Sequence, residues 1–184
     1  HKGNQFTIRL KDVACEEGQQ GAINARISLI QQEGFPNYFG PQRFGRNENN
    51  IASAMRSVES GRSPKKRFQR SITFSTLRSL LFNISLSERI GDATWKDALE
   101  GDVFALSGTE SFFVPNNSDD EKESVATRLT SGDIAVAGVM YGDGELPQVG
   151  IAAEKLLATL APYSSIMDFL VSQRVAMSVR PYSV

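Results

Sequence analysis

Residues 34–45 constrain the fold of this 184-residue chain most strongly, because they combine three Gly and two Pro with four aromatic residues. So many helix-breaking residues predict a backbone that does not run as a helix. The polar residues among the rings carry amide or guanidinium groups, which read the edge of a nucleobase while aromatic rings stack on its face. The segment therefore indicates either a nucleobase pocket or a buried loop whose rings fill a core, and the second is the more common use of an aromatic loop.

The order of residues within this segment carries a resemblance to a known family. Asn37-Tyr38-Phe39-Gly40-x-Gln42-Arg43-Phe44-Gly45 resembles the signature of the TruD-type tRNA pseudouridine synthases. Other segments are similar to that family over about residues 2–180: they are Gly3-Asn4-x-Phe6, then Arg70-Ser71 with Ser75, Arg78-Ser79 and Leu81-Phe82-Asn83, and finally Gly101-Asp102, Gly108 and Phe112-Phe113.

The resemblance implies an α+β fold, in which part of a pseudouridine-synthase-type catalytic α/β scaffold carries an inserted α+β domain. Residues 1–60 and 176–184 would belong to the catalytic domain, and residues 61–175 would form the inserted domain. The implied activity is isomerisation of a uridine in tRNA to pseudouridine, in the D-arm region at position thirteen. It implies tRNA as the partner and requires no metal and no organic cofactor.

The resemblance also implies roles for four residues of the signature. Asn37 matches the family's uridine-contacting Asn, and Phe39 matches its ring beside the base. Gln42 and Arg43 match residues that we expect to support the loop or to contact phosphate.

One element of the family is absent from these residues. Its catalytic Asp precedes the signature in a Gly-x-Lys-Asp-x-x-Ala-x-Thr stretch, and no Asp of this chain has that context. We therefore expect an internal piece of the enzyme with no catalytic residue of its own, inactive when alone.

A basic stretch follows the aromatic segment. Residues 56–70 hold six cationic residues against the single acid Glu59. Such a run is more often a solvated linker. Its place after a base-reading loop favours contact with RNA phosphates, which we expect at Lys65, Lys66, Arg67 and Arg70.

Composition narrows the remaining functions. With a single Cys the chain holds no intrachain disulfide, and with a single His we expect no Ser-His or Cys-His catalytic arrangement. The net charge is −1, so RNA binding must depend on local patches. We expect a cytoplasmic protein without a membrane span. Two alternatives stay open, a non-catalytic RNA-binding module and a structural or interaction domain with no RNA role.

Apolar periodicity predicts the secondary structure. Strands are expected at residues 4–13 and 134–140, at 176–181 as a strand returning to the first sheet, and as a hairpin at 103–106 and 111–114. Helices are expected at 16–32, 51–58, 72–90, 119–128, 152–160 and 166–175, with Gly34 ending the first and Pro162 separating the last two.

Overall fold

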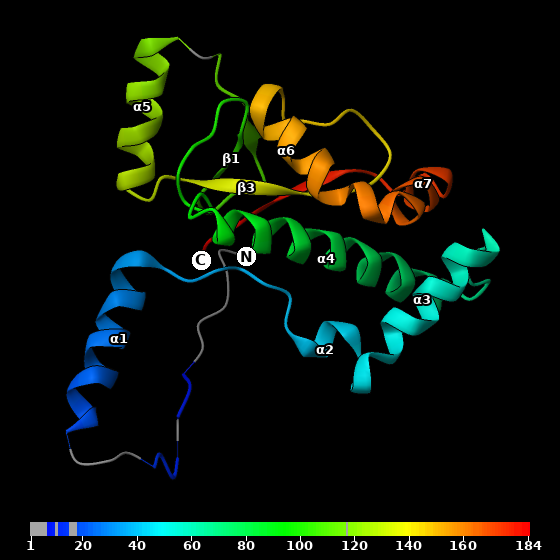
Figure 1. Ribbon diagram of the computed structural model, residues 1–184, viewed down its shortest axis with the longest axis horizontal. Coiled ribbons are helices and arrows are strands. Elements are labelled where there is room, and N and C mark those ends of the chain that lie inside the picture. Colours follow the sequence, from blue (N-terminus) through cyan, green and yellow to red (C-terminus); the bar gives the residue numbers. More distant parts are fainter. Residues whose placement is uncertain (1–6, 10, 15–17, 117) are drawn as a thin grey trace. The chain divides into compact units, whose positions relative to one another are not determined.

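A computed structural model of the chain describes residues 7–9, 11–14, 18–116 and 118–184 (Figure 1). The chain divides into two units, residues 1–35 with Val184, and residues 36–183. Among the described residues, every helix is too short or too polar to cross a membrane.

The described part of the first unit contains the helix α1 (Gln19–Glu33), which confirms the helix predicted there. It ends at Gly34, whose N–H donates to the carbonyl of Ile30 at 2.9 Å. Phe35 and Val184 exchange two backbone hydrogen bonds, of 2.9 and 3.1 Å. No side chain of α1 is buried.

The strand predicted at residues 4–13 is wrong wherever the structure describes it. Residues 7–9 and 11–14 lie in no strand, and the side chain of Ile8 is 82% exposed. Alternating apolar residues define a face, but a strand also needs a neighbouring strand for its backbone N–H and C=O groups. Residues 4–6 and 10 lie outside the described residues, as does the Gly3-Asn4-x-Phe6 segment.

Residues 36–183 form helices around a four-stranded antiparallel sheet, which confirms the mixed α+β fold (Figure 1). The strand order is β2-β1-β3-β4. The strands are β1 (Val103–Leu106), β2 (Phe112–Phe113), β3 (Ile134–Met140) and β4 (Ser178–Pro181); the α-helices are α2 (Pro41–Phe44), α3 (Asn49–Ser60), α4 (Arg67–Gly91), α5 (Asp119–Thr130), α6 (Gly150–Leu160) and α7 (Ser164–Ser172), with 3-10 turns η1 (Arg46–Glu48) and η2 (Ala161–Tyr163).

Helix α4 is the central element of this unit and lies along β3 (Figure 1). Leu77 and Leu81 are fully buried in a cluster with residues of α3, α6 and α7. Phe82 and Leu86 are fully buried in a second cluster with residues of the sheet and α5. Burial of each such side chain contributes about 1.5–3 kcal/mol to stability. Helix α4 therefore stabilises both clusters of the unit.

Strand β4 confirms the strand predicted at residues 176–181, but its partner differs from the expected one. It pairs antiparallel with β3, with Val179 opposite Val139. Immediately after β4, the Tyr182 ring lies over Gly138, where an added Cβ would stand only 2.2 Å from Cε1 of the ring. Gly138 therefore gives Tyr182 its place in the core.

The other predicted helices and strands of this unit are confirmed within a few residues. In the hairpin, Phe104 pairs with Phe113. Helix α5 begins at an N-cap serine, because the Ser118 Oγ accepts a hydrogen bond from the N–H of Glu121 at 3.3 Å. The division into a catalytic and an inserted domain at residues 60 and 176 stays a prediction.

Candidate functional site

The aromatic segment contains one helical turn, and the prediction that it excludes a helix is wrong at α2. Pro41 occupies the first helical position, where its missing N–H costs nothing. Gly45 ends the turn with φ +81°, and a Cβ at this position would stand 2.8 Å from Cγ of Asn50. The breakers thus limit the helix to four residues and do not prevent it.

Helix α4 holds the segment in place through Asn83. The Asn83 Oδ1 accepts from the N–H of Phe39, and its Nδ2 donates to the carbonyl of Phe39, both at 2.9 Å. One turn further along, Ser87 Oγ and the Tyr38 hydroxyl lie 2.9 Å apart. The Asn83 amide thus bonds the backbone N–H and C=O of Phe39, which in an extended segment would otherwise pair with a neighbouring strand.

A second residue of α4, Arg78, holds strands β3 and β4 in place. Arg78 Nη2 donates to the Met140 carbonyl at 2.9 Å and to Ser178 Oγ at 2.6 Å. Its Nε donates to the Tyr141 carbonyl at 3.2 Å. Burial lowers the pKa of Arg78 from its usual value. Arg78 therefore joins the end of β3 to the start of β4.

Asn37 is 9% exposed and uses its side-chain amide within the protein. Its Nδ2 donates to the Pro181 carbonyl at 2.9 Å, and its backbone N–H donates to the Tyr182 carbonyl at 2.8 Å. Its Oδ1 accepts a hydrogen bond from Nη2 of Arg180. The amide thereby joins the segment to β4 and orients Arg180.

The Phe39 ring is half-buried and is contacted by two guanidinium groups. The Arg180 guanidinium carbon lies 4.2 Å from the ring centroid, and that of Arg43 lies 5.2 Å from it. The edge of Phe39 meets Phe82 in a T-shaped contact at 5.6 Å between centroids. Phe82 belongs to the buried core, so its contact with Phe39 limits the movement of the Phe39 ring.

Burial lowers the pKa of Arg180 from its usual value, and the neighbouring charge of Arg43 lowers it further. Within the described residues, neither guanidinium forms a salt bridge with a carboxylate. The site therefore carries unneutralised positive charge beside an aromatic ring, a combination suited to an aromatic anion such as a nucleotide.

Phe39 lines two open grooves. One, of about 590 Å³, is also lined by Gln42, Arg43 and residues Ile72 and Ser75 of α4. The other, of about 540 Å³, is lined by Arg180, residues of β4 and the loop between β1 and β2. Both volumes lie within the range of small-molecule sites. The structure thus places Gln42 and Arg43 in one groove with Phe39, whereas Asn37 lines neither groove and is linked to the ring through Arg180.

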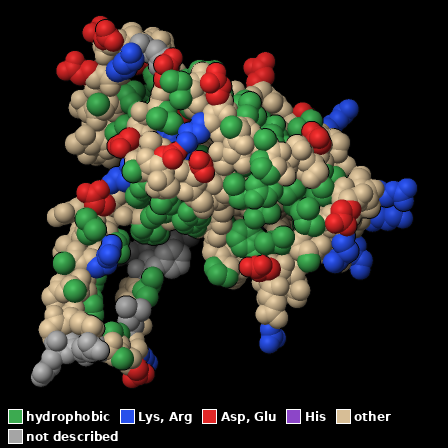
Figure 2. Space-filling model, in the orientation of Figure 1, with side chains coloured by type: hydrophobic (Ala, Val, Ile, Leu, Met, Phe, Trp, Pro, Cys, Tyr) green, Lys and Arg blue, Asp and Glu red, His purple; other side chains and the backbone are tan. Residues whose placement is uncertain are grey.

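The basic residues lie apart from the two grooves, at the start of α4. Lys65, Lys66, Arg67 and Arg70 are all exposed. Figure 2 shows Lys and Arg side chains gathered where α3 gives way to α4. Cations are unfavourable at a helix N-terminus, where the helix dipole is positive, so a bound anion would stabilise this arrangement.

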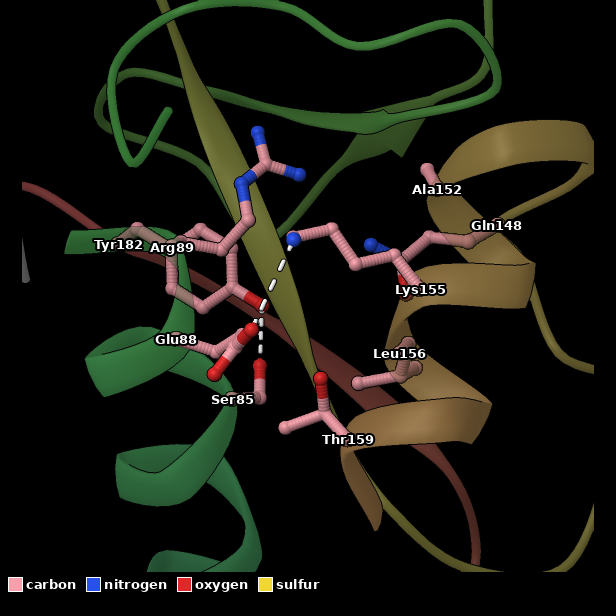
Figure 3. A pocket seen from close by; sticks show the side chains of 9 residues that line it. All are labelled: Ser85, Glu88, Arg89, Gln148, Ala152, Lys155, Leu156, Thr159 and Tyr182. Atoms are coloured by element: carbon pink, nitrogen blue, oxygen red, sulfur yellow. Dashed lines mark hydrogen bonds and ion pairs between the residues drawn. The ribbon is translucent and has the colours of Figure 1, made fainter. Parts of the chain in front are cut away.

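A third cavity lies between α4 and α6 (Figure 3). Its volume of about 10 Å³ corresponds to one water molecule. Lys155 forms ion pairs there with Glu88 and Asp92, and the buried Oε1 of Gln148 has no donor among the described residues. The cavity is too small for a nucleoside, so its polar groups join the two helices.

Arg180 is the residue of the site that sequence reasoning missed, since it stands 143 positions from Asn37 and no periodicity marks it.

Asp102 lies in a Gly-Asp pair of the resemblance, and its role is structural. It is fully buried and pairs with Arg89 at 2.8 Å. Among the described residues, no group of three or more His, Cys, Asp and Glu side chains could hold a metal ion.

The fold matches that of a pseudouridine synthase. A crystal structure from Methanosarcina mazei, assigned as tRNA pseudouridine synthase D (TruD), superposes with a TM-score of 0.61 over 92% of this chain and 56% of that one, at 14% identity. The family model described as tRNA pseudouridine synthase D (TruD) matches residues 1–56.

Two curated relatives extend this similarity along the chain. A tRNA pseudouridine synthase D of Aeromonas salmonicida is 38% identical over 98% of this chain and 49% of its own length. Another, of Pseudomonas fluorescens, is 35% identical over 94% of this chain and 47% of its own length. The chain belongs to the TruD family, as the resemblance predicted, and spans about half the length of these relatives.

Proposed function

We propose that this chain is part of a tRNA pseudouridine synthase, an isomerase that converts uridine in tRNA to pseudouridine. The observation that carries the proposal is the 38% identity with a relative of that name over 98% of the chain. The cluster around Phe39 supports it, because the reaction needs a nucleotide out of its stack, next to a ring and polar groups that hold the freed base.

We further propose the D-arm uridine at position thirteen as the target, tRNA as the partner and the cytoplasm as the location. Asn37 would contact the uracil edge and Phe39 would lie beside the base, with Gln42 and Arg43 in support. Lys65, Lys66, Arg67 and Arg70 would contact the RNA backbone. Residues 1–60 and 176–184 would belong to the catalytic domain, with 61–175 inserted.

The nucleophilic Asp of the family belongs to a segment that these residues do not contain. We therefore expect the purified 184-residue chain to form no pseudouridine. The full-length protein, incubated with unmodified tRNA transcripts, should form one pseudouridine per molecule, and replacing uridine thirteen with cytidine should abolish the product. Mass spectrometry after cyanoethylation measures both reactions.

Three results would contradict parts of this proposal. Conversion of uridine by the 184-residue chain would show that its own residues supply the nucleophile. Product at another position would refute the target. Salt-dependent tRNA binding by a full-length protein without any product would support the alternative, a non-catalytic RNA-binding module.

A further inference from the structure

We infer that Arg43 and Arg180 together bind one phosphate group of the RNA, beside the Phe39 ring. The inference deepens the proposed function and rests on it for the source of the phosphate. Its evidence is the charge, the free donors and the access of the two guanidinium groups.

Arg43 and Arg180 concentrate positive charge at the Phe39 ring. Both guanidinium carbons lie within 5.2 Å of the same ring centroid, and the charge of Arg43 helps to lower the pKa of Arg180. Two cations held near each other repel, and partial burial weakens the screening by water. An anion that contacts both would remove that repulsion.

Two other arginines in the described part of the chain also contact aromatic rings. Arg89 contacts the Tyr182 ring and pairs with Asp102 at 2.8 Å. Arg128 contacts the Phe113 ring and pairs with Asp133 at 2.6 Å. In both cases a carboxylate neutralises the cation.

Arg43 and Arg180 differ from that pattern, since the described residues provide no carboxylate partner for either of them. Glu110 lines the groove of Arg180 without forming a salt bridge to it.

The Arg180 guanidinium has N–H groups that donate to no described residue. Within the described residues, only Asn37 accepts hydrogen bonds from Arg180, through Nη2. The Arg180 Nε is buried and has no acceptor. A guanidinium offers five N–H donors in a planar fork that matches a phosphate. Because Nε is buried and Nη2 donates to Asn37, the two N–H groups of Nη1 are the donors left without an acceptor among the described residues.

Both arginines line open grooves beside Phe39. Phe39 lines both grooves, with Arg43 in one and Arg180 in the other. A phosphate that contacts both guanidinium groups would therefore lie beside Phe39, the residue that the two grooves share. Asn37 holds Arg180 in position by the bond to Oδ1, which gives the amide a positioning role in addition to any contact with uracil.

The test compares uridine 5′-monophosphate with uridine as ligands of the full-length protein, by isothermal titration calorimetry. The monophosphate should bind at least about tenfold more tightly, as expected for one charge-assisted hydrogen-bonded contact. Arg43→Gln and Arg180→Gln should each remove most of that difference. Arg180→Lys should restore part of it.

Arg128→Gln is the matched control, because it also removes a ring-stacked guanidinium, and it should keep the full difference. Equal binding of the two ligands by the wild-type protein, including no binding of either, would overturn the inference. So would an unchanged difference in Arg43→Gln, a folded variant because Arg43 is exposed.

A separate readout distinguishes this inference from the proposed function. Failure of the full-length protein to form pseudouridine would contradict the function, whereas the difference between the two ligands measures the phosphate site directly. If product forms but a neutral methylphosphonate at each linkage next to the target uridine leaves single-turnover rates unchanged, the function stands and the phosphate site is refuted.

Discussion

Asn83 binds both backbone groups of Phe39, at 2.9 Å each, across 44 positions of sequence. Helix α4 thereby sets the position of the ring that the two guanidinium groups contact. The contact also explains why Leu81-Phe82-Asn83 belongs to the resemblance: Phe82 supports the ring from the core, and Asn83 fixes its backbone.

Asn83→Ala should destabilise the protein by about 2 kcal/mol, because an N–H and a C=O of a part-buried residue lose their partners. Asn83→Asp keeps the acceptor but sets a carboxylate oxygen against the Phe39 carbonyl, so it should also cost stability. Asn50→Ala is the control, since Asn50 donates one longer bond of 3.3 Å to the Arg43 carbonyl in an exposed place. Urea denaturation measures all three, and equal costs for Asn83→Ala and Asn50→Ala would contradict this role.

Asp102→Ala should cost about 3–5 kcal/mol, because it leaves the buried Arg89 without its carboxylate. The Arg128–Asp133 pair is partly exposed, so Asp133→Ala should cost about 1 kcal/mol or less. Denaturation curves for the two variants give the comparison. Similar costs would show that burial does not decide the strength of these pairs.

Tyr182 should make stability depend on alkaline pH. Burial raises the pKa of Tyr182 to about 12, above the value near 10 of an unfolded chain. Between these two values the unfolded state releases the proton and the folded state keeps it, so the free energy of unfolding falls as pH rises. The slope contributed by this group is about 1.4 kcal/mol per pH unit at most.

Tyr182→Phe should remove that slope above pH 10, in addition to a constant loss of the hydrogen bond with Ser85. Ser85→Ala loses the same bond but keeps the titrating group, so its slope should persist. Urea denaturation between pH 9 and pH 11.5 compares the three proteins. A slope in Tyr182→Phe equal to that of the wild type would assign it to other groups.

The sequence predictions succeeded where local patterns determine the structure and failed where contacts between distant residues do. Helix α4 was predictable because Leu77 and Leu81 repeat at helical spacing and are both fully buried. The strand at residues 4–13 was not, since alternation at Phe6, Ile8 and Leu10 carries no information about a neighbouring strand. Arg180 contacts Phe39 only after β4 has paired with β3, and no local pattern records that contact.

Charge reversal of Lys65, Lys66 and Arg67 should weaken binding of the full-length protein to all tRNAs about equally, because phosphate contacts carry no sequence information. The slope of log K against log salt should decrease in magnitude by about 2 to 3. Filter binding at several salt concentrations tests this. A changed preference among tRNAs with affinity retained would contradict a backbone role.

Phe39→Ala and Asn37→Ala in the full-length protein should separate stacking from edge recognition. Loss of the ring removes a contact worth about 1–3 kcal/mol to a stacked base. Loss of the amide leaves the uracil edge without a partner and frees Arg180, at a cost of about 1–3 kcal/mol. Both costs should appear in single-turnover rates more than in tRNA affinity, which comes from phosphate contacts elsewhere.

The same two variants test whether Phe39 only fills the core. A fully buried Phe costs about 3–5 kcal/mol of stability when truncated to Ala. Phe39 is half-buried against Phe82, so we expect a smaller loss, with a modest fall in melting temperature and a large fall in turnover. Phe82→Ala, in the core, is the matched control and should show the full loss of stability. If Phe39→Ala instead lowers the melting temperature as far as Phe82→Ala does and keeps wild-type turnover per folded molecule, the ring serves the fold and not the reaction.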